Sequence, residues 1–195
     1  MVDEGFLYVC DYQKHEVRRY RVGDTTGTVV TGGNGRGGRL SQLYNPAYVF
    51  VDRNHSIYVW DNTHHRVMEW VKGAKEGIVL AGGRCEGNLL TQLSYHRGVF
   101  VDPLGTVYVV EAGNHRVMRW CNEATQGNVI IGGNGEGQQA NQLSRLWGLY
   151  MAISMSPIVG MIELMLCVLK ILNDVELEIR CGDVADEETC STLLF

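Results

Sequence analysis

Short apolar runs, each bounded by glycine, asparagine, aspartate or proline, follow one another through the first three quarters of the chain. In one unit the runs are 99–101, 106–110, 116–121 and 128–131, and turn-forming residues separate them. The runs are rich in β-branched and aromatic residues, which is typical of short antiparallel strands. The pattern therefore predicts four strands per unit.

This unit repeats with an offset of 50 residues and without insertions. A fixed period of this size that carries several short strands predicts a propeller, in which each unit is one blade, or a solenoid. We expect full blades at residues 48–83 and 98–133, and a partial blade that lacks its first strand at residues 5–33. The repeat positions that define the two full blades are His65, Arg66, Trp70, His115, Arg116 and Trp120.

Several motifs of one copy together resemble the NHL repeat. They are the Val-Tyr-Val run at 107–109, the segment Asn114-His115-Arg116-Val117, Trp120 and the glycine-rich segment 132–135. NHL repeats build six-bladed β-propellers, so the resemblance implies an all-β fold of four-stranded antiparallel blades. It covers residues 5 to about 150, within a propeller segment that we set at residues 1–150. The sequence departs from the NHL pattern at 14–17, at 63–66 and after Trp147.

The repeat ends soon after a further first strand at Gly148-Leu149-Tyr150. The segment 149–172 is apolar and long enough to span a bilayer, although serine, proline and glycine interrupt it and Glu163 lies near its middle. We expect residues 151–195 to form a divergent tail, first apolar, with a helix as one expectation, and then acidic. Our hypothesis for its origin is a shifted reading frame or a mis-spliced exon, and a membrane anchor is the alternative.

Two full blades with fragments at both ends are too few for a closed ring, which needs about four blades. We therefore expect an open arc with exposed apolar blade faces, which is marginally stable or self-associates. The first strand that is missing from residues 5–33 indicates either a fragment of a longer protein or a strand supplied from elsewhere.

Composition and charge add few constraints. The chain is 45% hydrophobic and 20% charged, with a net charge of -5. Residues 1–148 are nearly neutral, so the negative charge lies in the tail. No signal peptide is visible before the first strand, and a signal peptide upstream of this sequence stays open. The location is therefore unknown, with a cytoplasmic one slightly favoured, or a membrane one if the apolar tail is an anchor. The six cysteines show no regular spacing, so neither a zinc site nor a disulfide framework is indicated, although Cys181 and Cys190 are near enough in sequence to close a small loop.

Histidines and carboxylates that recur with the blade are the first candidates for chemistry. His15, His65 and His115 share one repeat position, and zinc-dependent peptide-amidating lyases use a related propeller, which is a precedent for a metal site. A histidine that recurs in the turn between the second and third strands is more simply explained by hydrogen bonds to the neighbouring backbone. Carboxylates recur at strand ends, at Asp52, Asp61, Asp102 and Glu111, where turn capping explains them. We find no catalytic constellation, and we expect no enzyme activity, no cofactor and no metal.

The segments that join successive blades vary in charge and size on a constant frame, as a recognition surface requires. RNA binding of the TRIM-NHL kind would need a marked basic excess, whereas Glu136 stands where the first copy has Arg36. We therefore expect a non-catalytic module that binds a protein or a small ligand. The alternatives are an RNA-binding propeller, a zinc-dependent lyase and a membrane-anchored repeat protein. The candidate recognition residues are Arg36, Arg39, Arg84, Glu86, Arg97, Glu136 and Gln138.

Overall fold

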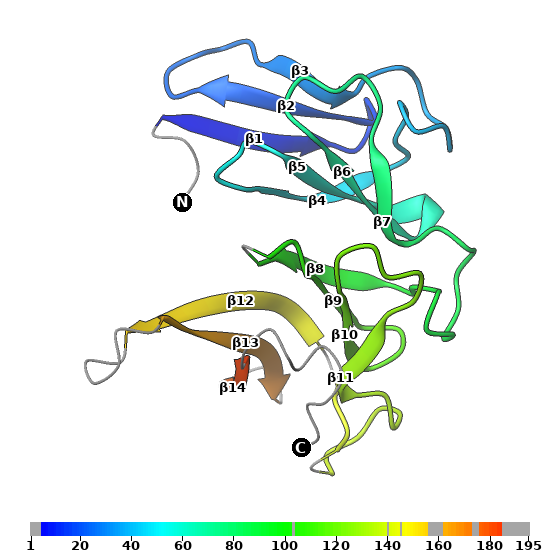
Figure 1. Ribbon diagram of the computed structural model, residues 1–195, viewed down its shortest axis with the longest axis vertical. Coiled ribbons are helices and arrows are strands. Elements are labelled where there is room, and N and C mark those ends of the chain that lie inside the picture. Colours follow the sequence, from blue (N-terminus) through cyan, green and yellow to red (C-terminus); the bar gives the residue numbers. More distant parts are fainter. Residues whose placement is uncertain are drawn as a thin grey trace.

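The computed structural model describes residues 5–102, 104–139, 141–144, 146–155, 162–172 and 176–184. These residues form four antiparallel sheets, and their one helical element is a 3-10 turn at Asn62–His64. The all-β class and the antiparallel blades expected from the sequence are thereby confirmed. Figure 1 shows the sheets following one another in an arc, from β1–β3 at the top to β12–β14 at the lower left.

The first three sheets are copies of one blade, which we call A, B and C. Blade A has three strands in the order β1-β2-β3, and blades B and C each have four strands in chain order. Blade A comprises β1 (Phe6–Asp11), β2 (Glu16–Arg21) and β3 (Thr28–Gly32). Blade B comprises β4 (Pro46–Val51), β5 (Ile57–Asp61), β6 (Arg66–Trp70) and β7 (Ile78–Gly82). Blade C comprises β8 (His96–Val101), β9 (Val107–Glu111), β10 (Arg116–Trp120) and β11 (Asn128–Gly132).

A register shift recurs at one position of every blade. It lies between Val17 and Arg18, between Val67 and Met68, and between Val117 and Met118, where the third strand of a full blade pairs with the fourth. Such a bulge adds local twist to the sheet. Because blade A shows it as well, β1 corresponds to β5 and β9, and among the described residues blade A has no counterpart of the inner strands β4 and β8.

The hydrophobic core lies between blades rather than within one sheet. Val59 and Trp70 of blade B pack against Val17 of blade A, and Val109 and Trp120 of blade C join a cluster with residues of blade B. Each tryptophan also packs against a glycine of its own blade: a Cβ at Gly77 or Gly127 would lie 2.8 or 2.6 Å from the indole ring. Stability therefore depends on neighbouring blades, as in other repeat proteins.

The inner strands are less buried than the sequence suggests. The first strand of a blade lies toward the centre of a propeller, which predicts that Val49, Val51, Val99 and Val101 are buried between blades. Val51 and Val101 are buried, but Val49 and Val99 are only partly buried, so this prediction is wrong for two of the four. The physical reason is that β4 and β8 are edge strands, each hydrogen-bonded to a neighbour on one side.

The tail begins as the next copy of the repeat. β12 (Leu146–Met155) pairs with β13 (Ile162–Leu172), which pairs with β14 (Glu176–Val184), all antiparallel. The register of β12 shifts between Leu146 and Gly148, at the repeat position where β4 and β8 shift, and β12 contacts β8 and β9.

The helix considered for the tail is not what its described residues adopt, because these are strands. No helix among the described residues is long and apolar enough to cross a membrane. Residues 156–161, within the apolar segment, and residues 185–195, which include Cys190, lie outside the described residues.

Candidate functional site

The antiparallel topology places two kinds of loop at the same end of each blade. Consecutive strands alternate in direction, so the turn between the second and third strands lies at the end where the fourth strand finishes and the next blade begins. We call the segments that join blades the connectors: residues 33–45 join A to B, residues 83–95 join B to C, and 133–144 follow blade C. Loops that converge at one end of a rigid scaffold are the expected place for a binding site.

A buried arginine fastens each of the first two connectors. Nε of Arg66 donates to Oδ2 of Asp61 at 2.8 Å, and its two terminal nitrogens donate to the carbonyls of Gly38, Arg39 and Gln42 at 3.0, 3.3 and 3.2 Å. Arg116 repeats the arrangement with Glu111 and with the carbonyls of Asn88, Leu89 and Gln92. The recurring arginine of the His-Arg motif therefore holds a connector against its blade.

The recurring histidines shape the turn. His15, His65 and His115 all have positive φ, at 57, 49 and 50°, and their carbonyls accept the N–H of Gly33, Gly83 and Gly133. The His15 ring accepts the N–H of Asn45 through Nδ1 at 3.3 Å. Among the described residues, no three histidine, cysteine or acidic side chains are grouped so that they could hold a metal ion. This geometry gives the histidines a structural part in the turn.

The carboxylates that follow the inner strands cap turns. Oδ1 of Asp52 accepts the N–H of Asn54 and Ser56, and its Oδ2 accepts the hydroxyl of Tyr58 at 3.2 Å. Asp102 binds Leu104, Thr106 and Tyr108 in the same way. These contacts are the Asx-turn pattern, and they leave neither carboxylate placed as one of an acid-base pair.

The junction between blades A and B differs from the junction between B and C. At A/B, the ring of Tyr44 lies 5.2 Å from that of His15 and 6.0 Å from that of His64, and the guanidinium of Arg36 lies 5.6 Å above it. His64 is oriented by Asp61, whose Oδ2 lies 3.0 Å from its Nδ1. We call Arg36, Tyr44, His15 and His64 the A/B cluster.

At B/C the equivalent positions are smaller and more acidic. Ser94 stands in place of Tyr44 and donates its hydroxyl to Glu86, which replaces Arg36, at 2.7 Å. Asn114 replaces His64 and donates to Gly87 and Glu111. The same frame therefore presents a basic aromatic surface at one junction and a short hydrogen-bonded polar surface at the next.

A cavity of about 390 Å³ adjoins the A/B cluster. Tyr12 and Asn62, which occupy one repeat position in adjacent blades, line it together with Asn45. The amide of Asn45 is held by Thr63, whose Oγ1 accepts from it at 3.2 Å. The remaining lining residues are Cys10, Pro46 and Ala47. Sequence reasoning missed these residues; the available signal was that Asn62 aligns with Ala112 and Ala47 with Arg97.

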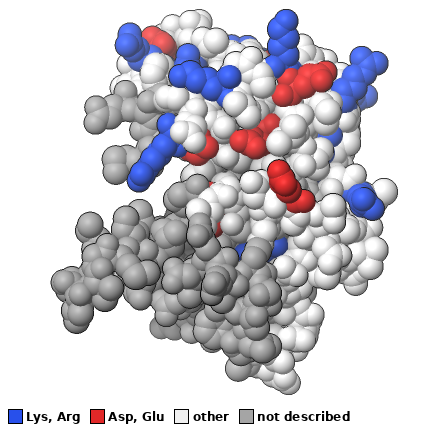
Figure 2. Space-filling view, in the orientation of Figure 1, with Lys and Arg blue, Asp and Glu red and all other residues white. Residues whose placement is uncertain are grey.

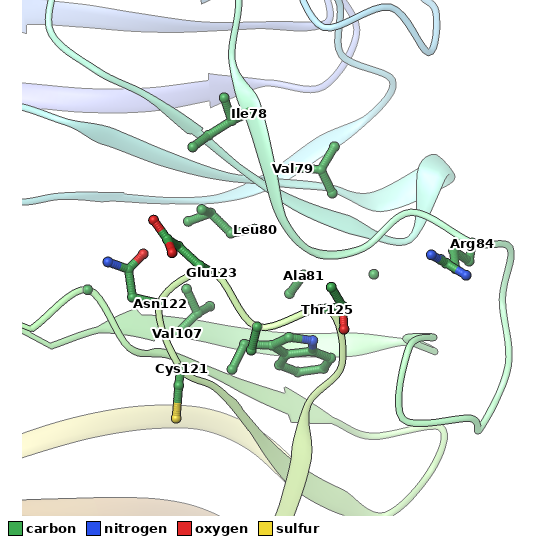
Figure 3. A pocket seen from close by; sticks show the side chains of 14 residues that line it. Ile78, Val79, Leu80, Ala81, Arg84, Val107, Cys121, Asn122, Glu123 and Thr125 are labelled. Carbon is green, nitrogen blue, oxygen red and sulfur yellow. The ribbon is translucent and has the colours of Figure 1, made fainter. Parts of the chain in front are cut away.

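A second cavity, of about 380 Å³, lies between the outer parts of blades B and C. Figure 3 shows Ile78, Val79 and Leu80 of β7 on one side, and Glu123 and Thr125 of the β10–β11 turn on the other. Its walls are the edge strand of one blade and a turn of the next. Of its lining residues, Arg84 alone belongs to a connector.

The residues proposed from the sequence for recognition are exposed but distributed. They lie in three connectors, with Arg36 and Arg39 in the first, Arg84 and Glu86 in the second, and Glu136 and Gln138 in the third. Arg97 is a correction, because it lies within strand β8 and not in a loop. On the face shown in Figure 2, basic and acidic side chains are interspersed over the described blades and form no continuous basic surface.

Thiols offer little chemistry near the cavity. Burial raises the pKa of the Cys10 thiol to about 12, so it remains protonated at neutral pH. Cys85 is exposed in a connector, and Cys121 is disulfide-bonded, which the irregular cysteine spacing did not predict.

No known family model matches the sequence, and no curated protein matches it either. Solved structures do resemble the fold. A protein of unknown function from Bacteroides thetaiotaomicron superposes with a TM-score of 0.58 at 15% identity, over 84% of this chain and 42% of that protein. An auxiliary nutrient binding protein from the same organism gives 0.56 at 11% identity, over 83% and 42%. A streptogramin B lyase structure gives 0.48 at 11% identity, over 91% and 51%.

The chain therefore spans about half or less of the length of these proteins. At such low sequence identity the likeness to these structures shows the fold alone. Together with the three copies of an antiparallel blade, it shows that this chain is an all-β protein with a β-propeller-like fold.

Proposed function

We propose that this chain is a non-catalytic binding module of the NHL-repeat kind, and that it binds a small ligand or a protein side chain in the A/B cavity. The observation that carries the proposal is the contrast between junctions. The cavity of about 390 Å³ lies beside the A/B cluster, whereas the repeat places Arg97 and Ser94 at the matching positions of B/C. Concave sites with a few convergent polar groups on a rigid scaffold are the usual form of ligand sites.

The lining residues define the ligand chemistry. Asn45 and Asn62 offer amide donors and acceptors, Tyr12 offers an aromatic face that is 62% exposed, and Pro46 is apolar. A ligand with a flat apolar face and one or two hydrogen-bonding groups complements this set. The likeness to an auxiliary nutrient binding protein is in keeping with a small-ligand site, through the fold alone.

Our proposal that the module lacks catalysis rests on the same side chains. The cavity has no pair of groups that could exchange a proton at neutral pH, because its residues are amides, a phenol, apolar side chains and the Cys10 thiol, whose pKa burial raises to about 12. We expect no hydrolase, lyase or transferase turnover. Stoichiometric zinc that is lost on His65→Ala or His115→Ala would instead support the lyase alternative.

The repeat supplies a matched pair of variants for the binding test. Ala47→Arg places in the A/B cavity the residue that blade C carries at the same position, and Arg97→Ala makes the reverse change in blade C. A panel of dipeptides, monosaccharides and nucleosides is screened by thermal shift, and the hits are titrated by calorimetry. We expect Ala47→Arg to weaken any hit at least tenfold and Arg97→Ala to leave it unchanged.

Two outcomes would overturn the proposal. Hits that bind Ala47→Arg as tightly as the unchanged protein would place the site elsewhere. Binding of single-stranded RNA that survives roughly 0.2 M salt and falls on the double change Arg36→Ala and Arg39→Ala would favour the RNA-binding alternative, because phosphate contacts dominate such binding.

A further inference from the structure

The cavity between the outer parts of blades B and C carries two opposite charges. Glu123 of the β10–β11 turn and Arg84 of the second connector both line it, and Figure 3 shows them at its two ends. Among the described residues, neither side chain has a hydrogen-bond or ion-pair partner. The rest of the lining includes Ile78, Leu80 and Trp120, so apolar surface accompanies the two charges.

Glu123 occupies a turn position that the other two blades give to glycine. Its φ is 61°, and the matching residues Gly23 and Gly73 have φ of 98 and 80°. A left-handed backbone strains a glutamate but not a glycine. The turn of blade B also carries two lysines, Lys72 and Lys75, that the turn of blade C lacks. Blade C therefore has an acidic turn where blade B has a basic one, at the cost of backbone strain.

Arg84 likewise replaces a residue with a structural role. In the first and third connectors this position holds Asn34 and Asn134, whose amides donate to the carbonyls of Ser41 and Asn141, each at 3.0 Å. The side chain of Arg84 donates no such bond to any described residue. The second connector thus gives up a cross-link and has a guanidinium at the cavity in its place.

Small side chains leave room beside these charges. Gly105 and Val107 line the cavity, whereas blade B has His55 and Ile57 at the same repeat positions. The nearest atom to a Cβ built on Gly105 would be Cγ of Asn122 at 4.0 Å, so a larger side chain there would extend toward the β10–β11 turn. The volume of about 380 Å³ lies within the usual range of small-ligand sites.

We propose that the outer B/C cavity binds an ω-amino acid, a zwitterion whose ammonium and carboxylate groups are joined by an unbranched apolar chain. The ammonium pairs with Glu123, the carboxylate pairs with Arg84, and the chain lies against Leu80 and Trp120. The planar guanidinium suits a carboxylate, and the two charges fix the direction of the ligand. This inference does not rest on the ligand proposed for the A/B cavity, which lies at the other junction.

Three probes separate the two charges. 6-Aminohexanoate has both, hexylamine keeps only the ammonium, and hexanoate keeps only the carboxylate. Each probe is titrated into the isotope-labelled full chain, and the amide signals of residues 78–82 and 121–125 report binding in the cavity. An ion pair at a partly exposed site adds at most about a fivefold gain. We therefore expect 6-aminohexanoate to bind about fivefold more tightly than either other probe.

Variants assign each charge to its partner. Glu123→Gln should weaken 6-aminohexanoate about fivefold and leave hexanoate unchanged, whereas Arg84→Gln should weaken it equally and leave hexylamine unchanged. Gly105→His fills the cavity with the residue of blade B, where His55 adopts a φ of 64°, and should weaken all three probes. Asp24→Asn, in the corresponding turn of blade A, removes a distant charge and should change none of the affinities.

A second measurement separates binding from folding. Glu123→Gly restores the glycine of the other blades, so it should raise the urea midpoint of unfolding while it weakens 6-aminohexanoate as much as Glu123→Gln does. A variant that gains stability and loses affinity has not failed to fold. The proposal would be overturned by equal affinity for the three probes, by a loss of hexanoate binding in Glu123→Gln, or by the absence of saturable shifts. Shifts confined to residues of the A/B cavity would also overturn it.

Discussion

Nε of Arg66 donates to Oδ2 of Asp61 across 2.8 Å, and both side chains are buried. The same carboxylate accepts the N–H of Tyr44 at 2.9 Å, so one ion pair joins strand, turn and connector. Arg116 and Glu111 repeat this with Ser94. The arrangement explains how a connector that varies in sequence is held to each blade in one conformation.

Removing the guanidinium should destabilise the protein severely. Arg66→Ala leaves Asp61 buried without its cation and three connector carbonyls without their donor, and breaking a buried pair in this way costs about 3–5 kcal/mol. Urea unfolding followed by tryptophan fluorescence measures the loss. Arg53→Ala, at an exposed turn position, is the control and should change little. A loss of stability below about 1 kcal/mol for Arg66→Ala would contradict a buried ion pair that holds the connector to the blade.

Alanine substitutions at two glycines with positive φ distinguish the cost of backbone strain from the cost of a steric clash. Gly73 and Gly82 have φ of 80 and 72°, but only at Gly82 would a Cβ meet other atoms, namely the His65 carbonyl and a Leu93 methyl at 2.7 Å. Gly73→Ala should cost about 1–2 kcal/mol, the price of a left-handed alanine. Gly82→Ala should cost clearly more in the same denaturation experiment, and equal losses would count against the packing described here.

The thiols of Cys10 and Cys85, both free, should differ in reactivity. Burial raises the pKa of Cys10 to about 12, so at pH 8 only about one molecule in ten thousand carries its thiolate, the species that alkylating reagents attack. Cys85 is exposed. Iodoacetamide at about pH 8 should label Cys85 at least a hundredfold faster, as read by peptide mass spectrometry. The difference should vanish in urea; equal labelling of the native protein would show that Cys10 is accessible.

Alkaline titration should distinguish the blade tyrosines. Burial, followed by the nearby acidic side chains, raises the pKa of Tyr58 above the ordinary tyrosine range, and burial raises that of Tyr108 likewise. A raised pKa means that the neutral phenol favours folding; this stabilisation is complete below the unfolded pKa of about 10 and is lost as pH rises through the folded value. Stability should therefore fall less steeply above about pH 10 in Tyr58→Phe than in the unchanged protein.

The tyrosinate absorbance of Tyr58→Phe gives a direct comparison for this titration. In the Tyr58→Phe variant, the number of tyrosines that ionise late should be one fewer than in the unchanged protein. The number that ionise early should be the same. If the early group shrinks instead, Tyr58 titrates as an exposed phenol and the buried bond to Asp52 is not formed.

The sequence by itself determined the repeat and the class of fold. The 50-residue period, the short β-branched runs and the turn residues are local signals, and each is read from residues close together in the chain. His65 and His115 were assigned to the same turn, and they adopt nearly the same φ of 49 and 50°. The strands of blades B and C follow the predicted runs because strand propensity and turn chemistry are set within a few residues.

Only the tertiary structure decided which of the side chains that differ between repeats lie together. Tyr12 and Asn62 are 50 residues apart and line one cavity because adjacent blades pack side by side. Arg36 lies over Tyr44 because the connector turns back on itself, with Arg36 bridged to Leu43. The helix considered for the tail is not found among its described residues for a related reason. The apolar run has no period that separates strand from helix, and its described residues pair as antiparallel strands. Such contacts depend on chain segments meeting in space, which no local pattern encodes.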